Sequence, residues 1–111
     1  MPDASAQLLP GTLDLLVLTV ASKQPEHGWG IGQRLLEVSG GVFEVNQGSL
    51  YPALQRLQKK GWIRSAWRTT ESGRPARYYS ITASGRRQLE RERRGWERQV
   101  EGIGLVLQWA T

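Results

Sequence analysis

Apolar side chains recur every three or four residues in the first third of the chain, as they do on one face of a helix: Leu13, Leu16, Val17 and Val20. Thr12 follows a Pro-Gly pair and is a suitable N-cap for this helix. The other side of the same stretch is also largely apolar. We therefore expect a helix that is central to the domain or also serves a contact between subunits.

The same spacing predicts a second helix after a loop at residues 23–28. This helix runs roughly from Gly30 to Ser39, with Ile31, Leu35 and Val38 facing inward. The loop contains Pro25 and the single histidine, His27, for which we expect no special role.

Leucines 4 and 3 residues apart define the inner face of a third helix: Leu50, Leu54 and Leu57. Asn46 and Ser49 are both good N-caps, and the sequence leaves the choice between them open. Pro52 favours the later start, because it would then lie in the first helical turn. The opposite face of this helix is polar and carries no acid.

Two short runs rich in aromatic and β-branched residues, 62–68 and 76–81, predict strands. The residues between them have turn chemistry throughout, so the two strands should form a hairpin. Tyr78 and Tyr79 must point to opposite faces of their strand, which places only one of them in the core.

A long last helix is predicted after Thr82. Its apolar positions are separated by 7, 4, 3 and 4 residues: Leu89, Trp96, Val100, Ile103 and Leu107. A domain this small cannot cover such a long stripe, so we expect it to pair with the stripe of a second copy. The charges from Arg91 to Arg98 are expected to form a solvated face with glutamate pairs.

Positive charge is concentrated in the third helix and the hairpin. Residues 56–77 contain seven basic residues and one acid, whereas the whole chain has a net charge of +5. A basic helix and hairpin suit a polyanion, because neutralising phosphates releases their counterions. The segment therefore favours binding to nucleic acid.

Several classes of function are excluded or disfavoured by composition. The chain has no cysteine and one histidine, which leaves no disulfide, thiolate metal site or nucleophile–base set. We therefore expect no catalytic residue, metal or cofactor, and the protein should not be an enzyme. No signal peptide or long apolar run is present, so we expect a soluble, cytoplasmic protein without a membrane partner.

Three helices followed by a hairpin are typical of a winged helix, in which the hairpin is the wing. The sequence resembles the PadR family of bacterial transcriptional regulators in the runs Gly48-Ser49-Leu50-Tyr51-Pro52-Ala53-Leu54 and Gly73-Arg74-Pro75-Ala76-Arg77-Tyr78-Tyr79. Further matching segments are Gly11-Thr12-Leu13, Gly28-Trp29-Gly30-Ile31, Gly61-Trp62-Ile63 and Thr82-Ala83-Ser84-Gly85, with Trp29 in place of a common tyrosine. The likeness covers roughly Leu9 to Leu89.

The resemblance implies a mainly α fold: a winged helix-turn-helix plus a long C-terminal dimerisation helix. Residues 1–81 would be the DNA-binding domain, with a lead-in at 1–9, and residues 82–111 the dimerisation helix. The implied function is that of a homodimeric repressor that binds a palindromic operator in double-stranded DNA. The family's smaller members dimerise through a single C-terminal helix, and this chain is similar to them.

The third helix is the candidate reader of the major groove. Gln47, Ser49 and Gln55 can bond base edges, and Tyr51 can bond a base or a phosphate. Arg56 and Lys59 suit phosphates. In the wing, Arg74 is placed to enter a minor groove or to touch the flanking backbone, and Arg77 completes the set.

Trp96 suggests an effector site. In drug-sensing relatives an aromatic residue of the terminal helix lines a flat pocket at the dimer interface, and Trp96, with Val100, matches that position. A small planar aromatic effector could stack there. Alternatively, Trp96 fills the core of the interface.

A winged helix can also bind RNA or another protein without sensing an effector. A polar helix face that is free of acids, beside a basic wing, favours duplex DNA over these alternatives. The operator sequence, the regulated gene and the choice between repression and activation do not follow from the sequence.

Overall fold

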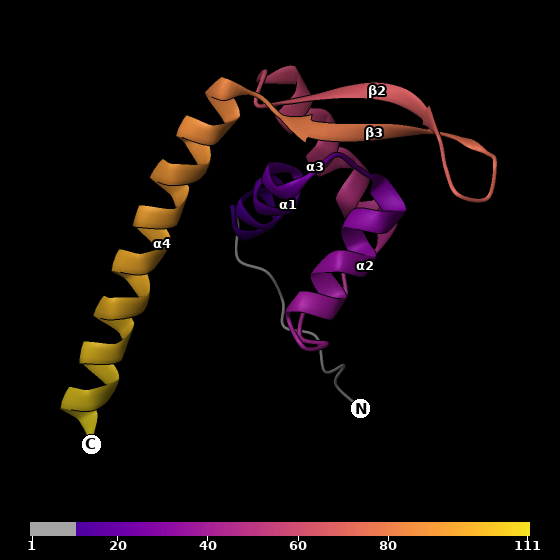
Figure 1. The fold of residues 1–111 in the computed structure, drawn as a ribbon. Helices are drawn as coiled ribbons and strands as arrows, with labels where there is room; N and C mark the ends of the chain where they lie inside the picture. Colours follow the sequence, from indigo (N-terminus) through magenta and orange to yellow (C-terminus); the bar gives the residue numbers. More distant parts are fainter. Residues whose placement is uncertain (1–10) are drawn as a thin grey trace.

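The computed structural model describes residues 11–111 and shows a winged helix with a long helix attached (Figure 1). The elements in chain order are α1 (Thr12–Lys23), β1 (Glu26–His27), α2 (Gly28–Val38), α3 (Gln47–Lys59), β2 (Ile63–Thr69), β3 (Pro75–Ile81) and α4 (Ala83–Ala110). The mainly α fold with a hairpin wing and a long C-terminal helix is thus confirmed. The expected lead-in at residues 1–9 lies outside the described residues.

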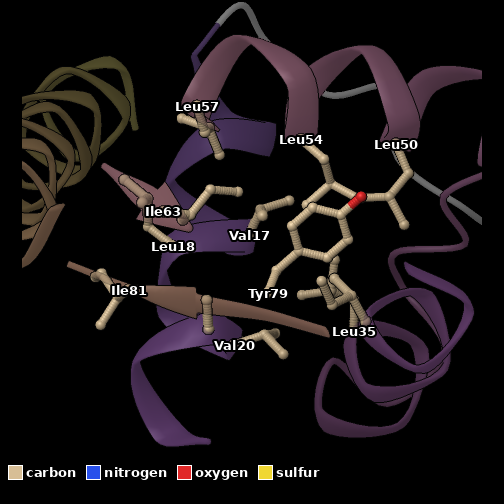
Figure 2. Packing of buried hydrophobic residues seen from close by; sticks show 12 residues of the cluster. Val17, Leu18, Val20, Leu35, Leu50, Leu54, Leu57, Ile63, Tyr79 and Ile81 are labelled. Atoms are coloured by element: carbon tan, nitrogen blue, oxygen red, sulfur yellow. The ribbon is translucent and has the colours of Figure 1, made fainter. Parts of the chain in front are cut away.

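The core lies between the first three helices and one face of the sheet. Its fully buried side chains come from α1, α2, α3 and β2: Val17, Leu18, Ile31, Leu50, Leu54, Leu57 and Ile63. Figure 2 shows the ring of Tyr79 next to Leu50 and Leu54 of α3 and Leu35 of α2. The prediction that α1 is central is confirmed, and Tyr79 rather than Tyr78 is the core tyrosine.

The sheet has three strands rather than the two that were predicted. The two-residue strand β1 lies in the expected loop and pairs antiparallel with β3, so that Glu26 faces Tyr79 and His27 faces Tyr78. A strand of this length is too short to show an alternating pattern in the sequence. β1 connects the wing directly to the start of α2.

The ends of two helices differ from the prediction. α2 begins at Gly28 instead of Gly30, because His27 caps it: the amide of Gly30 donates to His27 Nδ1 at 2.8 Å. Val38 is 69% exposed rather than inward-facing. Thr12 is the first residue of α1 rather than its cap, which is Gly11 with a φ of 87°.

The cap of α3 is Asn46, whose Oδ1 accepts a hydrogen bond from the amide of Ser49 at 2.8 Å. The structure thus selects Asn46 from the two caps that the sequence left open, and Pro52 lies inside the helix. Pro52 cannot donate to the carbonyl of Gly48, four residues earlier. Gly48 is exposed, so water can satisfy that carbonyl and the proline is tolerated.

α4 is fastened to the body only through its first turns. Thr82 caps it, accepting from the amide of Gly85 at 3.0 Å and donating to the carbonyl of Gly61 at 2.6 Å. Gly85 is buried, and Leu89 packs against the core. Glu92 still lies near Asp14 of α1, and beyond it the helix runs away from the body to the C-terminus (Figure 1). No helix among residues 11–111 is both long and apolar enough to cross a membrane.

Candidate nucleic-acid interface

α3 buries one side and exposes the other. Leu50, Ala53, Leu54 and Leu57 are at most 1% exposed and attach the helix to the body. The outward residues are Gly48, Ser49, Tyr51, Pro52, Gln55, Arg56, Gln58 and Lys59. This exposed side contains hydroxyls, amides and cations without an acid, which suits hydrogen bonding to base edges and phosphates.

Tyr51 lies over the start of α2. A Cβ atom at Gly28 would come within 3.1 Å of the Tyr51 hydroxyl, so glycine at this position lets the ring lie close to the backbone. The ring nevertheless remains 48% exposed. Tyr51 therefore lies against the backbone of α2 while about half of the residue stays exposed.

Two of the predicted reading residues are engaged within the protein. The side chain of Gln47 is partly buried against Gly32 of α2, and its Oε1 has no hydrogen-bond partner among the described residues. Arg56 donates to Asp14 Oδ1 of α1 at 3.0 Å. The structure therefore groups Ser49, Tyr51, Gln55 and Lys59 on the open surface and directs Gln47 toward α2 and Arg56 toward α1.

The tip of the wing is a tight turn that presents Arg74. The amide of Thr70 donates to the carbonyl of Arg74 at 2.8 Å, and the amide of Gly73 donates to the carbonyl of Thr70 at 2.9 Å. Gly73 has a φ of 86°, a conformation that residues with a side chain rarely adopt. Arg74 is exposed at this turn.

Arg77 lies on the face of the wing that continues the core. It is opposite Trp67 in the hairpin, and its guanidinium lies 5.4 Å from the centre of the Trp67 indole. Trp67 is 65% exposed and was not among the predicted site residues. On the other face of the hairpin, Arg68 lies 4.8 Å from the centre of the Tyr78 ring. Aromatic contacts of this kind fix the direction of an arginine without neutralising it.

A groove of about 1120 Å³ runs between the wing and the start of α2. Its walls include Trp29 of α2, Tyr51 of α3, and Trp67, Arg74 and Arg77 of the wing. Tyr51 is the residue through which α3 borders this groove. Tyr79 also lines this groove. Burial raises the pKa of its hydroxyl above the ordinary value, although nearby Arg77 partly opposes the rise, so the hydroxyl is neutral at physiological pH.

The apolar stripe of α4 is exposed in the single chain, except at its start. Trp96, Val100, Ile103 and Leu107 are 45–63% exposed, whereas Leu89 packs on the core of its own chain. Trp96 and Val100, the predicted effector residues, lie one turn apart on this stripe. Any pocket around them must be completed by another molecule. Among residues 11–111, no cluster of His, Asp and Glu could hold a metal ion.

Comparisons with known proteins agree with this geometry. The sequence model of the transcriptional regulator PadR-like family matches residues 17–91. A transcriptional regulator of Mycobacterium tuberculosis is 36% identical over 83 residues, which make up 75% of this chain and 74% of that protein. An uncharacterized protein of Lysinibacillus sphaericus is 26% identical over 103 residues, or 93% of this chain and 94% of that protein.

Solved structures show the same fold. The crystal structure of a PadR-like transcriptional regulator from Bacillus cereus superposes with a TM-score of 0.79 at 29% sequence identity. The match covers 93% of this chain and 98% of that one, so it includes the long terminal helix.

Proposed function

The chain belongs to the PadR-like family of transcriptional regulators, and from this premise we propose that it is a repressor that binds a palindromic operator as a homodimer. Residues 1–81 would form the DNA-binding domain and residues 82–111 the dimerisation helix. The observation that carries the proposal is the acid-free exposed side of α3, which borders a basic wing. A family of transcriptional regulators also argues against an enzymatic role.

In this proposal α3 enters the major groove. Ser49 and Gln55 bond base edges, Tyr51 bonds a base or a phosphate, and Lys59 bonds the backbone. Gln47 and Arg56 contribute only if their side chains leave their present partners. For Arg56 this step has a cost, since its partner Asp14 is only 13% exposed and would be left without a cation.

The wing supplies the second contact. Arg74 at the tip reaches the minor groove or the flanking phosphates, and Arg77 is directed by Trp67 toward the groove beside α3. Trp67 thus acts as a positioning residue for Arg77.

Binding of a fluorescent duplex that carries a selected site tests these assignments. Arg74→Ala should weaken binding by about 10- to 100-fold and reduce the salt dependence. Tyr51→Phe, which keeps the ring over Gly28, should lose affinity through the hydroxyl alone. Lys23→Ala removes an exposed cation from the end of α1 and is the matched control. Unchanged affinity in the first two variants would refute the assigned surface.

The homodimer would form through the α4 stripe, defined as Trp96, Val100, Ile103 and Leu107. These four side chains are 45–63% exposed in the single chain, and they repeat at the spacing of a coiled-coil seam. Pairing two stripes removes them from water and joins two reading surfaces, as a palindromic operator requires.

A small planar aromatic effector would stack between Trp96 and the same residue of the second copy, next to Val100, and release the DNA. Titration of a variant with Trp96 as its only tryptophan tests this idea by fluorescence. Quenching by planar aromatics with loss of operator binding is expected. A flat titration would show that Trp96 only fills the interface.

A further inference from the structure

A cluster of charged side chains lies where α1, α3 and α4 meet. Asp14 in the first turn of α1 accepts a hydrogen bond from the guanidinium of Arg56 in α3, at 3.0 Å. Glu92 of α4 lies near the same Asp14 carboxylate. Arg56 of the proposed reading helix is thus the cation bound at a pair of acids, and the second acid of the pair belongs to α4.

Glu92 has no close cation of its own. In the described part of the chain it forms no ion pair, and its Oε2 atom is buried without a hydrogen-bond partner. Burial raises the pKa of Glu92, and the Asp14 carboxylate raises it further. Three groups oppose the rise: the Gln88 side chain by a hydrogen bond, and the charges of Lys60 and Arg91. Because the pKa is raised all the same, Glu92 takes up a proton more readily than an ordinary glutamate.

The two partners of the ion pair differ in their freedom to leave it. Arg56 is 53% exposed, whereas Asp14 is only 13% exposed. The guanidinium can therefore turn toward a phosphate, while the Asp14 carboxylate stays against the body. Its departure would leave Asp14 beside Glu92, and two neighbouring carboxylates with little access to water repel each other. Protonation of Glu92 removes that repulsion.

We propose that Asp14 and Glu92 together restrain Arg56, and that release of Arg56 to a DNA phosphate is accompanied by uptake of one proton from solvent by Glu92. The inference rests on the proposed function, in which Arg56 can bind a phosphate. It makes the cluster a contact that holds back DNA binding while Glu92 is charged. Because Glu92 belongs to α4, the helix assigned to dimerisation also acts on the reading helix.

This link gives DNA binding a defined pH dependence. If the complex holds more protons than the separate molecules, the affinity increases as pH falls. The increase should occur above the ordinary glutamate value of 4.5, because the pKa of Glu92 is already raised in the free protein and loss of Arg56 raises it again. His27 is retained in all the variants used, so any titration of His27 cancels from the comparison.

The link can be measured first without DNA. Carbon-13 NMR of the Glu92 carboxyl group gives the pH midpoint of its titration in the full chain. Arg56→Gln imitates the departure of Arg56 and should raise this midpoint above that of wild type. Lys23→Gln removes an exposed cation from the other end of α1 and should leave the midpoint unchanged.

Binding of the selected duplex then tests the restraint itself. Asp14→Asn should tighten binding at neutral pH by about 3- to 30-fold, since each of the two copies releases one ion pair. Glu92→Gln should tighten binding by a smaller factor and should remove the increase in affinity between about pH 7.5 and pH 5. Glu90→Gln makes the same charge change two residues away, at a glutamate that pairs with Arg93, and should keep the pH dependence of wild type.

The same substitutions in an Arg56→Gln background separate the link from a general gain on removing acids. Without Arg56, neither Asp14→Asn nor Glu92→Gln should change the affinity. A gain from Asp14→Asn that is equal with and without Arg56 would overturn the proposal, and so would a Glu92 midpoint that Arg56→Gln leaves unchanged. A wild type that binds no duplex would sink the proposed function alone, and the NMR comparison would still decide whether Arg56 controls the proton of Glu92.

Discussion

The body and the distal half of α4 use similar apolar residues in opposite ways. In the body, Val17, Leu50 and Leu57 have no exposed surface. In α4, Ile103 and Leu107 are 56% and 63% exposed, although the helix is equally regular. The body therefore completes its core within one chain, whereas the distal half of α4 leaves its apolar residues exposed in the single chain. One region specifies the fold, and the other is the region to which we assign association.

The largest expected effect separates the two kinds of apolar residue. Leu54→Ala leaves a cavity in the body and should lower the free energy of unfolding by about 2–5 kcal/mol. Leu107→Ala removes a similar side chain from the α4 stripe and should leave the stability of the monomer nearly unchanged. Chemical denaturation at low protein concentration, where the dimer is dissociated, provides the comparison. Equal losses in both variants would mean that α4 folds onto its own body.

Substitutions in the α4 stripe, which should hardly change the stability of the monomer, should have the larger effect on association. Val100→Glu places a charge at the centre of the proposed seam, where it would be buried without a partner. The variant should be monomeric by sedimentation and should bind a palindromic duplex about 100-fold more weakly, because the two half-sites are no longer bound together. Its affinity for a single half-site should match that of wild type. A stable dimer in this variant would locate the interface elsewhere.

The junction between the two regions depends on Gly85. A Cβ atom there would collide with the carbonyl of Trp62 and lie 2.8 Å from Cγ1 of Ile81, so α4 must shift. Gly85→Ala should cost about 1–3 kcal/mol of stability. Gly95→Ala is the matched control, because a Cβ at Gly95 meets nothing within 4 Å. That substitution should stabilise the helix by roughly 1 kcal/mol. Thermal unfolding of the pair measures both.

The smallest effect concerns Glu92, where α4 passes α1. Partial burial raises the pKa of Glu92, and the nearby Asp14 carboxylate raises it further. The folded state therefore binds the proton of Glu92 more tightly than the unfolded state does, so protonation of Glu92 stabilises the fold at acid pH. It is lost as pH rises through the raised pKa, above the ordinary value of 4.5. Glu92→Gln should slightly raise the unfolding midpoint at neutral pH and not at pH 4. An equal rise of the unfolding midpoint at neutral pH and at pH 4 would show that the raised pKa of Glu92 is not the reason.

Local patterns in the sequence predict most of the body. The leucine spacing gives the inner face of α3, and strand alternation separates Tyr79 from Tyr78. The features that were missed depend on contacts distant in the sequence. β1 is defined by its pairing with β3, and Gln47 and Arg56 are directed by Gly32 and Asp14, respectively. A helical pattern shows which side chains point outward but not which neighbouring element they contact.

For α4, the sequence predicts the pattern of the helix but not how much of it is covered. Its stripe is visible in the sequence, but the exposure of Trp96 to Leu107 shows how little of it the chain can cover alone. The charges from Arg91 to Arg98 were expected to form a solvated face with glutamate pairs. Two such pairs are present among the described residues, and both use Arg93. The assignments of individual residues to DNA and to the dimer remain predictions.

Selection of bound sequences from random duplex DNA tests the central claim most directly, namely that two copies joined through α4 each read one half-site. The account predicts an enriched palindrome whose half-sites are centred about 10–10.5 base pairs apart, or a multiple of that distance. Enrichment of a single unpaired half-site, or no enrichment at all, would contradict it.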